Sequence, residues 1–175
     1  MDECVIIVDN SNIWIEGMKY SAKIKGLPNG PDGQEPCDYS WRIDFGKLLG
    51  LVAEGKKIRK AILVGSRPPK NDSLWQAAKR NGFDVIVNDR NSQNKEKSVD
   101  TKLVALGAKI LYTTEPATLK VLSGDSDFVP LLELAEENDW ESEIWAFSNA
   151  LGSVNLLGVA NRVESLDSHI STIQL

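Results

Sequence analysis

Aspartates at two points of the chain have the chemistry to hold a divalent cation. Asp125 and Asp127 lie one residue apart in a turn that contains a glycine, and Asp9 ends an earlier apolar run. Carboxylate oxygens are preferred ligands of hard divalent cations. Three carboxylates at one point repel one another unless a cation lies among them. These residues therefore predict a metal site wherever the fold brings them together.

Each of these acidic turns follows a predicted strand. Cys4–Val8 and Leu119–Leu122 are short apolar runs, and apolar residues recur at helical spacing after each of them. Open α/β sheets bind ligands beyond the carboxyl ends of their strands, so neighbouring strands here would bring Asp9 to Asp125 and Asp127. The alternative is that these residues only form turns and cap helices, where Asp and Ser are common.

Three further strands are predicted at Ala61–Val64, Phe83–Val87 and Glu143–Phe147, alternating with amphipathic helices. The last helix is expected to carry Val154, Leu156, Leu157 and Val159, followed by a short closing element or tail over Leu166–Leu175. This alternation predicts an α/β fold, a three-layer sandwich with a parallel five-stranded sheet. Right-handed crossovers, together with adjacent Asp9 and Asp125, select the strand order 3-2-1-4-5.

Length and composition fit one domain over residues 1–175, with 42% hydrophobic and 26% charged residues. Residues 21–40 hold three prolines and three glycines and are expected to form a long loop near the site. Two cysteines, Cys4 and Cys37, do not make a disulfide framework. No signal peptide or membrane span is recognisable. We therefore expect a cytoplasmic protein without membrane association.

The net charge of −5 argues at first against a nucleic-acid partner, but the charge is segregated along the chain. Residues 42–102 hold 14 of the 20 Lys and Arg residues against seven acids, whereas residues 103–175 hold three against 11. A basic surface beside an acidic metal site suits a phosphodiester substrate. The alternative is two ordinary solvated faces.

Further polar residues are candidates for the same site. Asp100 lies in the first turn of a predicted helix, off its apolar side, and can approach as a fourth acid; the helix dipole alone would also favour an Asp there. Arg67, Arg90 and Lys97 are candidates for gripping phosphates. Trp14 or Trp75 can stack on a base, with core packing as the alternative. The lone histidine, His169, lies in the tail, which argues against a histidine mechanism or a zinc site.

Three stretches together, Val8–Asn12, Glu96–Asp100 and Ser123–Phe128, resemble the NYN-domain branch of the PIN-like nucleases over roughly residues 4–166. The resemblance implies a PIN-like fold, bound Mg²⁺ or Mn²⁺ and cleavage of RNA. By position it implies Asp9, Asp125 and Asp127 as metal ligands, Asp100 as the remaining acid, and Asn12 and Ser126 as residues that orient ligands or phosphate. We count Asn10, Asn12 and Ser126 among the candidate RNA-binding residues. One departure is Asn161, where the family often has an Asp.

The predicted function is hydrolysis of phosphodiester bonds in single-stranded or flexible RNA by a metal-dependent endoribonuclease. Bound metals lower the pKa of water and stabilise charge on the leaving oxygen, which an anionic phosphodiester requires. The expected catalytic and metal-binding residues are the same four: Asp9, Asp100, Asp125 and Asp127. RNA is the expected partner, and a homodimer is left open. The alternative is a catalytically weak or inactive module of the same fold that binds RNA or protein.

Overall fold

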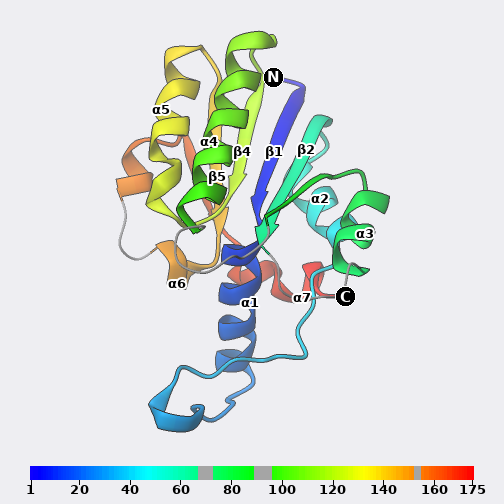
Figure 1. Ribbon diagram of the computed structural model, residues 1–175, viewed down its shortest axis with the longest axis vertical. Coiled ribbons are helices and arrows are strands. Elements are labelled where there is room, and N and C mark those ends of the chain that lie inside the picture. The colour runs from blue at the N-terminus through cyan, green and yellow to red at the C-terminus, as the bar shows by residue number, and fades with distance from the viewer. Residues whose placement is uncertain (67–72, 89–95, 152–154) are drawn as a thin grey trace.

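A six-stranded, wholly parallel sheet forms the centre of the molecule in the computed structural model, which describes residues 1–66, 73–88, 96–151 and 155–175 (Figure 1). The strand order is β3-β2-β1-β4-β5-β6. The strands are β1 (Glu3–Asp9), β2 (Lys57–Ser66), β3 (Asp84–Asn88), β4 (Thr118–Leu122), β5 (Glu141–Ala146) and β6 (Arg162–Ser165). The α/β class and the parallel order predicted from the sequence are confirmed.

Helices cover both faces of the sheet and produce three layers. They are α1 (Asn10–Ile24), α2 (Phe45–Ala53), α3 (Ser73–Arg80), α4 (Glu96–Thr113), α5 (Val129–Glu137), α6 (Ser148–Leu151) and α7 (Ile170–Ile173), with 3₁₀ turns at Pro31–Gly33, Ser126–Phe128, Asn155–Gly158 and Asp167–His169. Alternate residues of β1 belong to two separate cores, Ile6 and Val8 to the core under α1, α2, α3 and α7, and Val5 and Ile7 to the core under α4 and α5. Among the described helices, none combines the length and apolar character that crossing a membrane requires.

The chain order reverses between β1 and β4, the two central strands. β1 to β3 progress toward one side of the sheet, and β4 to β6 progress toward the other. β1 and β4 pair in parallel up to Val8 and Leu122, so the residues that follow leave the sheet side by side. This is the switch point at which open α/β sheets bind ligands. The predicted adjacency of Asp9 and the β4 turn therefore follows from the observed pairing.

The end of the chain differs from the prediction. β6 is a sixth strand, paired in parallel with β5, where the sequence predicted no strand. Of the predicted last helix, Val154 lies outside the described residues, and Leu156 and Leu157 belong to the 3₁₀ turn Asn155–Gly158 instead of an α-helix. A strand of four half-buried residues is too short to show a period, and its pairing depends on contacts with β5.

The predicted loop at residues 21–40 is shorter, because α1 continues to Ile24 and a 3₁₀ turn forms at Pro31–Gly33. Near residue 38, this segment is hydrogen-bonded to the last turn of α1 and to the residue that follows it. Asp38 accepts hydrogen bonds from the Ser21 hydroxyl at 2.6 Å and from Lys25 Nζ at 2.5 Å. Trp41 is fully buried against Gly17, where a Cβ atom would lie 2.3 Å from the indole ring. This segment therefore follows a defined path beside α1.

Candidate active site

The first functional turn begins where β1 ends. Asp9 has extended backbone geometry and caps α1, its Oδ1 accepting a hydrogen bond from Asn12 N at 3.2 Å. The apolar run before Asp9 is fully buried, whereas Asp9 itself retains 7% exposure. A strand that ends in a capping Asp therefore holds one carboxylate at the edge of the sheet.

The second functional turn follows β4. Asp125 caps the 3₁₀ turn Ser126–Phe128, its Oδ1 accepting from Asp127 N at 3.0 Å. Phe128 is fully buried and anchors this turn in the core, whereas Asp125 is partly exposed and Asp127 and Ser126 are exposed. Asp9 and Asp125 thus both cap helical turns, as the simpler interpretation predicted. Capping alone does not account for the contacts between the two turns.

Two hydrogen bonds join the turns. The buried Ser123 hydroxyl donates to Asp9 Oδ2 at 3.0 Å and accepts from Asp125 N at 3.1 Å. Asn12 Oδ1 accepts from Gly124 N at 3.1 Å, which ties the first turn of α1 to the end of β4. We call Asp9, Asp125 and Asp127, held in this way, the aspartate edge.

A close backbone approach fixes the same turn from its other side. A Cβ atom on Gly124 would lie 2.5 Å from Ala150 Cβ and 2.7 Å from Ala150 O. Only glycine lets α6 pack this closely against the β4 turn. Ser123 and Gly124 are therefore positioning residues, a role that the sequence analysis did not assign to them. The sequence signal that could have identified them is the pair of small residues directly after a predicted strand.

Asp9 and Asp125 carry like charges close together in the aspartate edge. Burial raises the pKa of Asp9, and the nearby charge of Asp125 raises it further, while hydrogen bonds from Asn12 and Ser123 oppose the shift. Within the described residues, no Lys or Arg forms an ion pair with any of the three aspartates. A cation placed here would favour the charged form of Asp9.

Beside Asp9, the Asn10 side chain is 4% exposed, and its Oδ1 has no hydrogen-bond partner in the described part of the chain. A buried oxygen without a partner is costly unless another group satisfies it. The donor set at this edge, carboxylate and amide oxygens, fits Mg²⁺ or Mn²⁺. The described residues nevertheless contain no group of three or more His, Cys, Asp or Glu placed to hold a metal.

Four predicted residues fall partly or wholly outside the described part of the chain. Arg67 and Arg90 lie outside it. Lys97 and Asp100 belong to the first two turns of α4, but their side chains are not described. The prediction that Asp100 completes the acidic set therefore stays a prediction.

The remaining predicted residues have structural contacts. Trp75 is 3% exposed in the core, and Trp14 packs against the same core while partly buried. Asn161 Oδ1 accepts from Ser142 N at 2.7 Å, at the amino end of β5. Because the strands are parallel, this is the sheet edge opposite the aspartates. Asn161, where the family often has an Asp, therefore contacts β5 and lies away from the aspartate edge.

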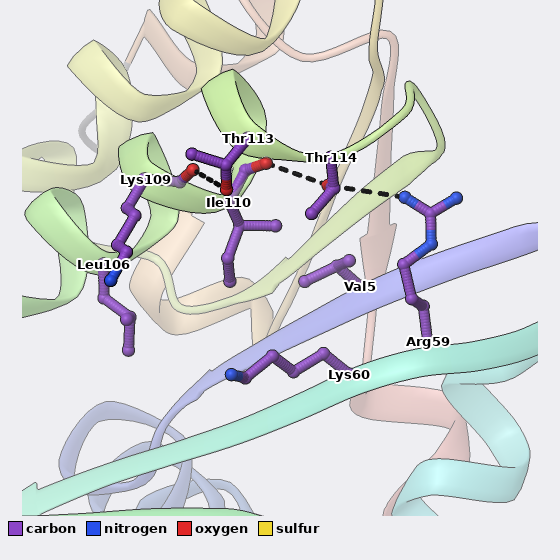
Figure 2. Close-up of a pocket in the computed structure, with 8 residues that line it drawn as sticks. All are labelled: Val5, Arg59, Lys60, Leu106, Lys109, Ile110, Thr113 and Thr114. Carbon is purple, nitrogen blue, oxygen red and sulfur yellow. Dashed lines mark hydrogen bonds between the residues drawn. The ribbon is translucent and has the colours of Figure 1, made fainter.

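A cavity of about 240 Å³ lies between α4 and the amino halves of β1 and β2. Its lining includes basic side chains (Figure 2). Arg59 in its wall is held by Glu3 at 2.6 Å and donates to Glu115 O at 2.5 Å. Lys60 pairs with Asp84 at 3.4 Å. Part of the basic segment predicted to bind phosphate is thus neutralised within the fold, away from the aspartates.

Comparison with known proteins agrees with this architecture. The family model of the NYN domain matches residues 11–167, a stretch that includes Asp100, Asp125 and Asp127 and begins just after Asn10. The fold is similar to the crystal structure of a protein of unknown function from Vibrio parahaemolyticus, with a TM-score of 0.70 and 17% sequence identity over 99% of this chain and 96% of the other. No curated protein sequence matches the chain.

Proposed function

Because the chain belongs to the NYN-domain family, we propose that it is a metal-dependent endoribonuclease that hydrolyses phosphodiester bonds in single-stranded or flexible RNA. One observation supports the proposal most strongly. Asp9 and Asp125 leave adjacent strands at the switch point, joined through Ser123, and no basic side chain among the described residues neutralises them. NYN domains are usually nucleases, and Mg²⁺ or Mn²⁺ is the cofactor we propose.

In this proposal Asp9 and Asp125 hold the cation, with Asp100 and Asp127 as the remaining acids of the set. A bound cation supplies a water of lowered pKa and stabilises charge on the leaving oxygen. Ser123 keeps the Asp9 carboxylate oriented by donating to Oδ2. Asn12 holds the two turns in register by accepting from Gly124 N. The exposed Ser126 and Asp127 lie on the solvent side, where a substrate strand approaches.

The cellular setting that we propose is the cytoplasm, where RNA substrates are available. The two cysteines, buried Cys4 and half-buried Cys37, are free thiols, in keeping with a reducing compartment.

The test is cleavage of an end-labelled single-stranded RNA with Mn²⁺, with Mg²⁺ and with chelator. Asp125→Asn keeps the shape and the capping oxygen and removes the charge, so we expect cleavage to fall about a hundredfold to a thousandfold. Asp44→Asn is the matched control, because Asp44 caps α2 through a 3.0 Å bond from Lys47 N and lies outside the aspartate edge. Equal cleavage by Asp125→Asn and the wild type would refute the assignment.

A second candidate is a binding module with little or no turnover. It is favoured by the absence of a three-ligand group among the residues that the structure describes. The same assay separates the two candidates. Failure of the wild type to cut RNA with either metal, with RNA still retained in a binding assay, would select the binding module.

A further inference from the structure

A groove of about 380 Å³ lies between α1, the segment before Asp38 and the start of α6. Its lining includes Lys19, Tyr20 and Lys23 from α1, Glu35 and Pro36, and the first two residues of α6. We call it the α1–α6 groove. α1 extends beyond the carboxyl ends of the strands (Figure 1), so the part of α1 that lines the groove lies on the same end of the molecule as the aspartates.

One face of α1 connects the aspartate edge to this groove. Asn12, Glu16, Lys19 and Lys23 recur at intervals of three or four residues, so they lie along one face of the helix. Asn12 contacts the β4 turn at 3.1 Å, and Glu16 accepts a hydrogen bond from the Asn149 side chain of α6. From Asn12 to Lys23 the helix rises about 16 Å, the length of about five stacked nucleotides.

The groove has the chemistry of a nucleic-acid path. Lys23 is exposed and forms no ion pair within the described residues. Tyr20 is half-buried and stacks on Phe147 with ring centroids 5.8 Å apart, which fixes the orientation of its ring in the wall. Cations that follow a backbone, together with an aromatic ring, are the usual features of single-strand binding grooves.

The other lysine of the groove, Lys19, is paired with two carboxylates, Glu16 at 3.3 Å and Glu35 at 2.9 Å. Glu35 is 74% exposed and comes from the opposite wall of the groove. Its segment is fixed by Asp38, whose backbone N–H donates to Met18 O at 3.0 Å and whose carboxylate binds Ser21 and Lys25. The groove therefore has a defined wall, and Glu35 holds the position at Lys19 that a phosphate would take.

From these contacts we infer that the α1–α6 groove binds the single-stranded RNA that flanks the scissile phosphate, with Lys23 and Lys19 contacting its backbone. The inference rests on the proposed function for the identity of the strand. It assigns a binding role to residues that lie outside the acidic motifs. Glu35 competes with the strand for Lys19.

The experiment measures binding of a fluorescein-labelled, unstructured 12-nucleotide RNA by anisotropy in chelator, so that no cleavage occurs. Lys23→Glu should weaken binding about tenfold, and Lys23→Ala should lower the slope of log K against log salt by about 0.7, the value for one phosphate contact of a single strand. Glu35→Gln should tighten binding about twofold. Misfolding would not produce effects of opposite sign at two exposed positions.

Lys109→Glu is the matched control, since Lys109 is an exposed lysine at the cavity on the opposite edge and has no ion pair among the described residues (Figure 2). It should change binding less than twofold. Two results would refute RNA binding in the groove without refuting the nuclease activity. One is an equal effect of Lys23→Glu and Lys109→Glu, and the other is a wild type that cleaves RNA with Mn²⁺ but does not bind it in chelator. Groove-dependent binding without metal-dependent cleavage would support the groove and refute the nuclease.

Discussion

Two charged regions of the same sheet are built in opposite ways. In the first, Lys120 of β4 is fully buried and pairs with Glu54 at 2.7 Å and Glu143 at 2.9 Å, while Arg162 pairs with Glu54 at 2.8 Å. We call these four residues the charge network. In the aspartate edge, only five residues beyond Lys120, no carboxylate has a basic partner among the described residues. The charges of the network are paired within the fold, whereas the acids without a basic partner among the described residues are the ones that we propose bind a cation.

The acids of the two regions respond oppositely to their surroundings. The Arg162 guanidinium and Lys120 lower the pKa of Glu54 to about 2, although burial opposes the shift. Burial raises the pKa of Asp9, and the hydrogen bonds from Asn12 and Ser123 only partly oppose this shift. At neutral pH the ion pairs of Glu54 in the charge network therefore stabilise the fold, whereas the buried carboxylate of Asp9 in the aspartate edge destabilises it. Such an arrangement is expected where function requires an uncompensated charge.

The largest effect on folding is expected in the charge network. Lys120→Met keeps the length of the side chain but leaves Glu143, which is 8% exposed, without its nearest cation. The free energy of unfolding should fall by about 3 kcal/mol. Denaturant unfolding measures this loss, and cleavage by the folded variant well below its Tm should match the wild type. A stability loss under about 1 kcal/mol would contradict the account of the network.

A smaller loss is expected at the contact that positions the aspartate edge. In Gly124→Ala the new Cβ would lie 2.5 Å from Ala150 Cβ, so the β4 turn or α6 must shift. Overpacking of this kind costs about 2 kcal/mol. Metal-dependent cleavage should fall along with stability, because Asp125 follows directly.

The control for this variant is Gly50→Ala, an exposed position in α2 with open space around its Cβ. It should be neutral or stabilising by about 0.5 kcal/mol. If Gly124→Ala behaved like Gly50→Ala in both stability and cleavage, the close approach to α6 would not position the site.

A smaller effect, a gain in metal-free stability at pH 7, is expected for Asp9→Asn, because the amide also caps α1 and removes a buried charge that has no basic partner among the described residues. Since the folded-state pKa of Asp9 is raised, the wild type is destabilised progressively as the pH rises above the ordinary value of 3.8. The gain should therefore vanish near pH 3. Thermal unfolding in chelator at both pH values measures it, and a loss of stability at pH 7 would refute the prediction.

The smallest effect is expected for Glu54→Gln. Because the folded-state pKa of Glu54 is lowered to about 2, its pairs stabilise the fold above the ordinary value of 4.5 and lose this effect as the pH falls toward about 2. Glu54 is 32% exposed, so solvent limits the loss at pH 7 to about 1 kcal/mol. The difference from wild type, which is opposite in sign to that of Asp9→Asn, should shrink between pH 4.5 and 2. A difference that grows in this range would contradict the pairing.

The layers, the order of β1 to β5 and the contact of Asp9 with the β4 turn could be predicted from the sequence. They follow from the apolar runs and from the right-handed connections between parallel strands. The sequence was not sufficient for β6, which has only four half-buried residues and is placed by β5. Lys120 had no sequence signal, since a buried cation depends on partners 66 and 23 residues away in the chain. The roles of Ser123 and Asn12 likewise depend on contacts across more than a hundred residues.

We propose that the aspartate edge, and not the charge network, holds the cation. This claim is tested most directly by Mn²⁺ binding, followed by titration calorimetry or by the electron paramagnetic resonance of free Mn²⁺, in the wild type, Asp125→Asn and Glu54→Gln. Both variants lose one negative charge, so a general effect of net charge is matched. We predict that Glu54→Gln binds Mn²⁺ like the wild type and that Asp125→Asn loses the site. Equal Mn²⁺ binding by the wild type and Asp125→Asn, or none by the wild type, would contradict the account.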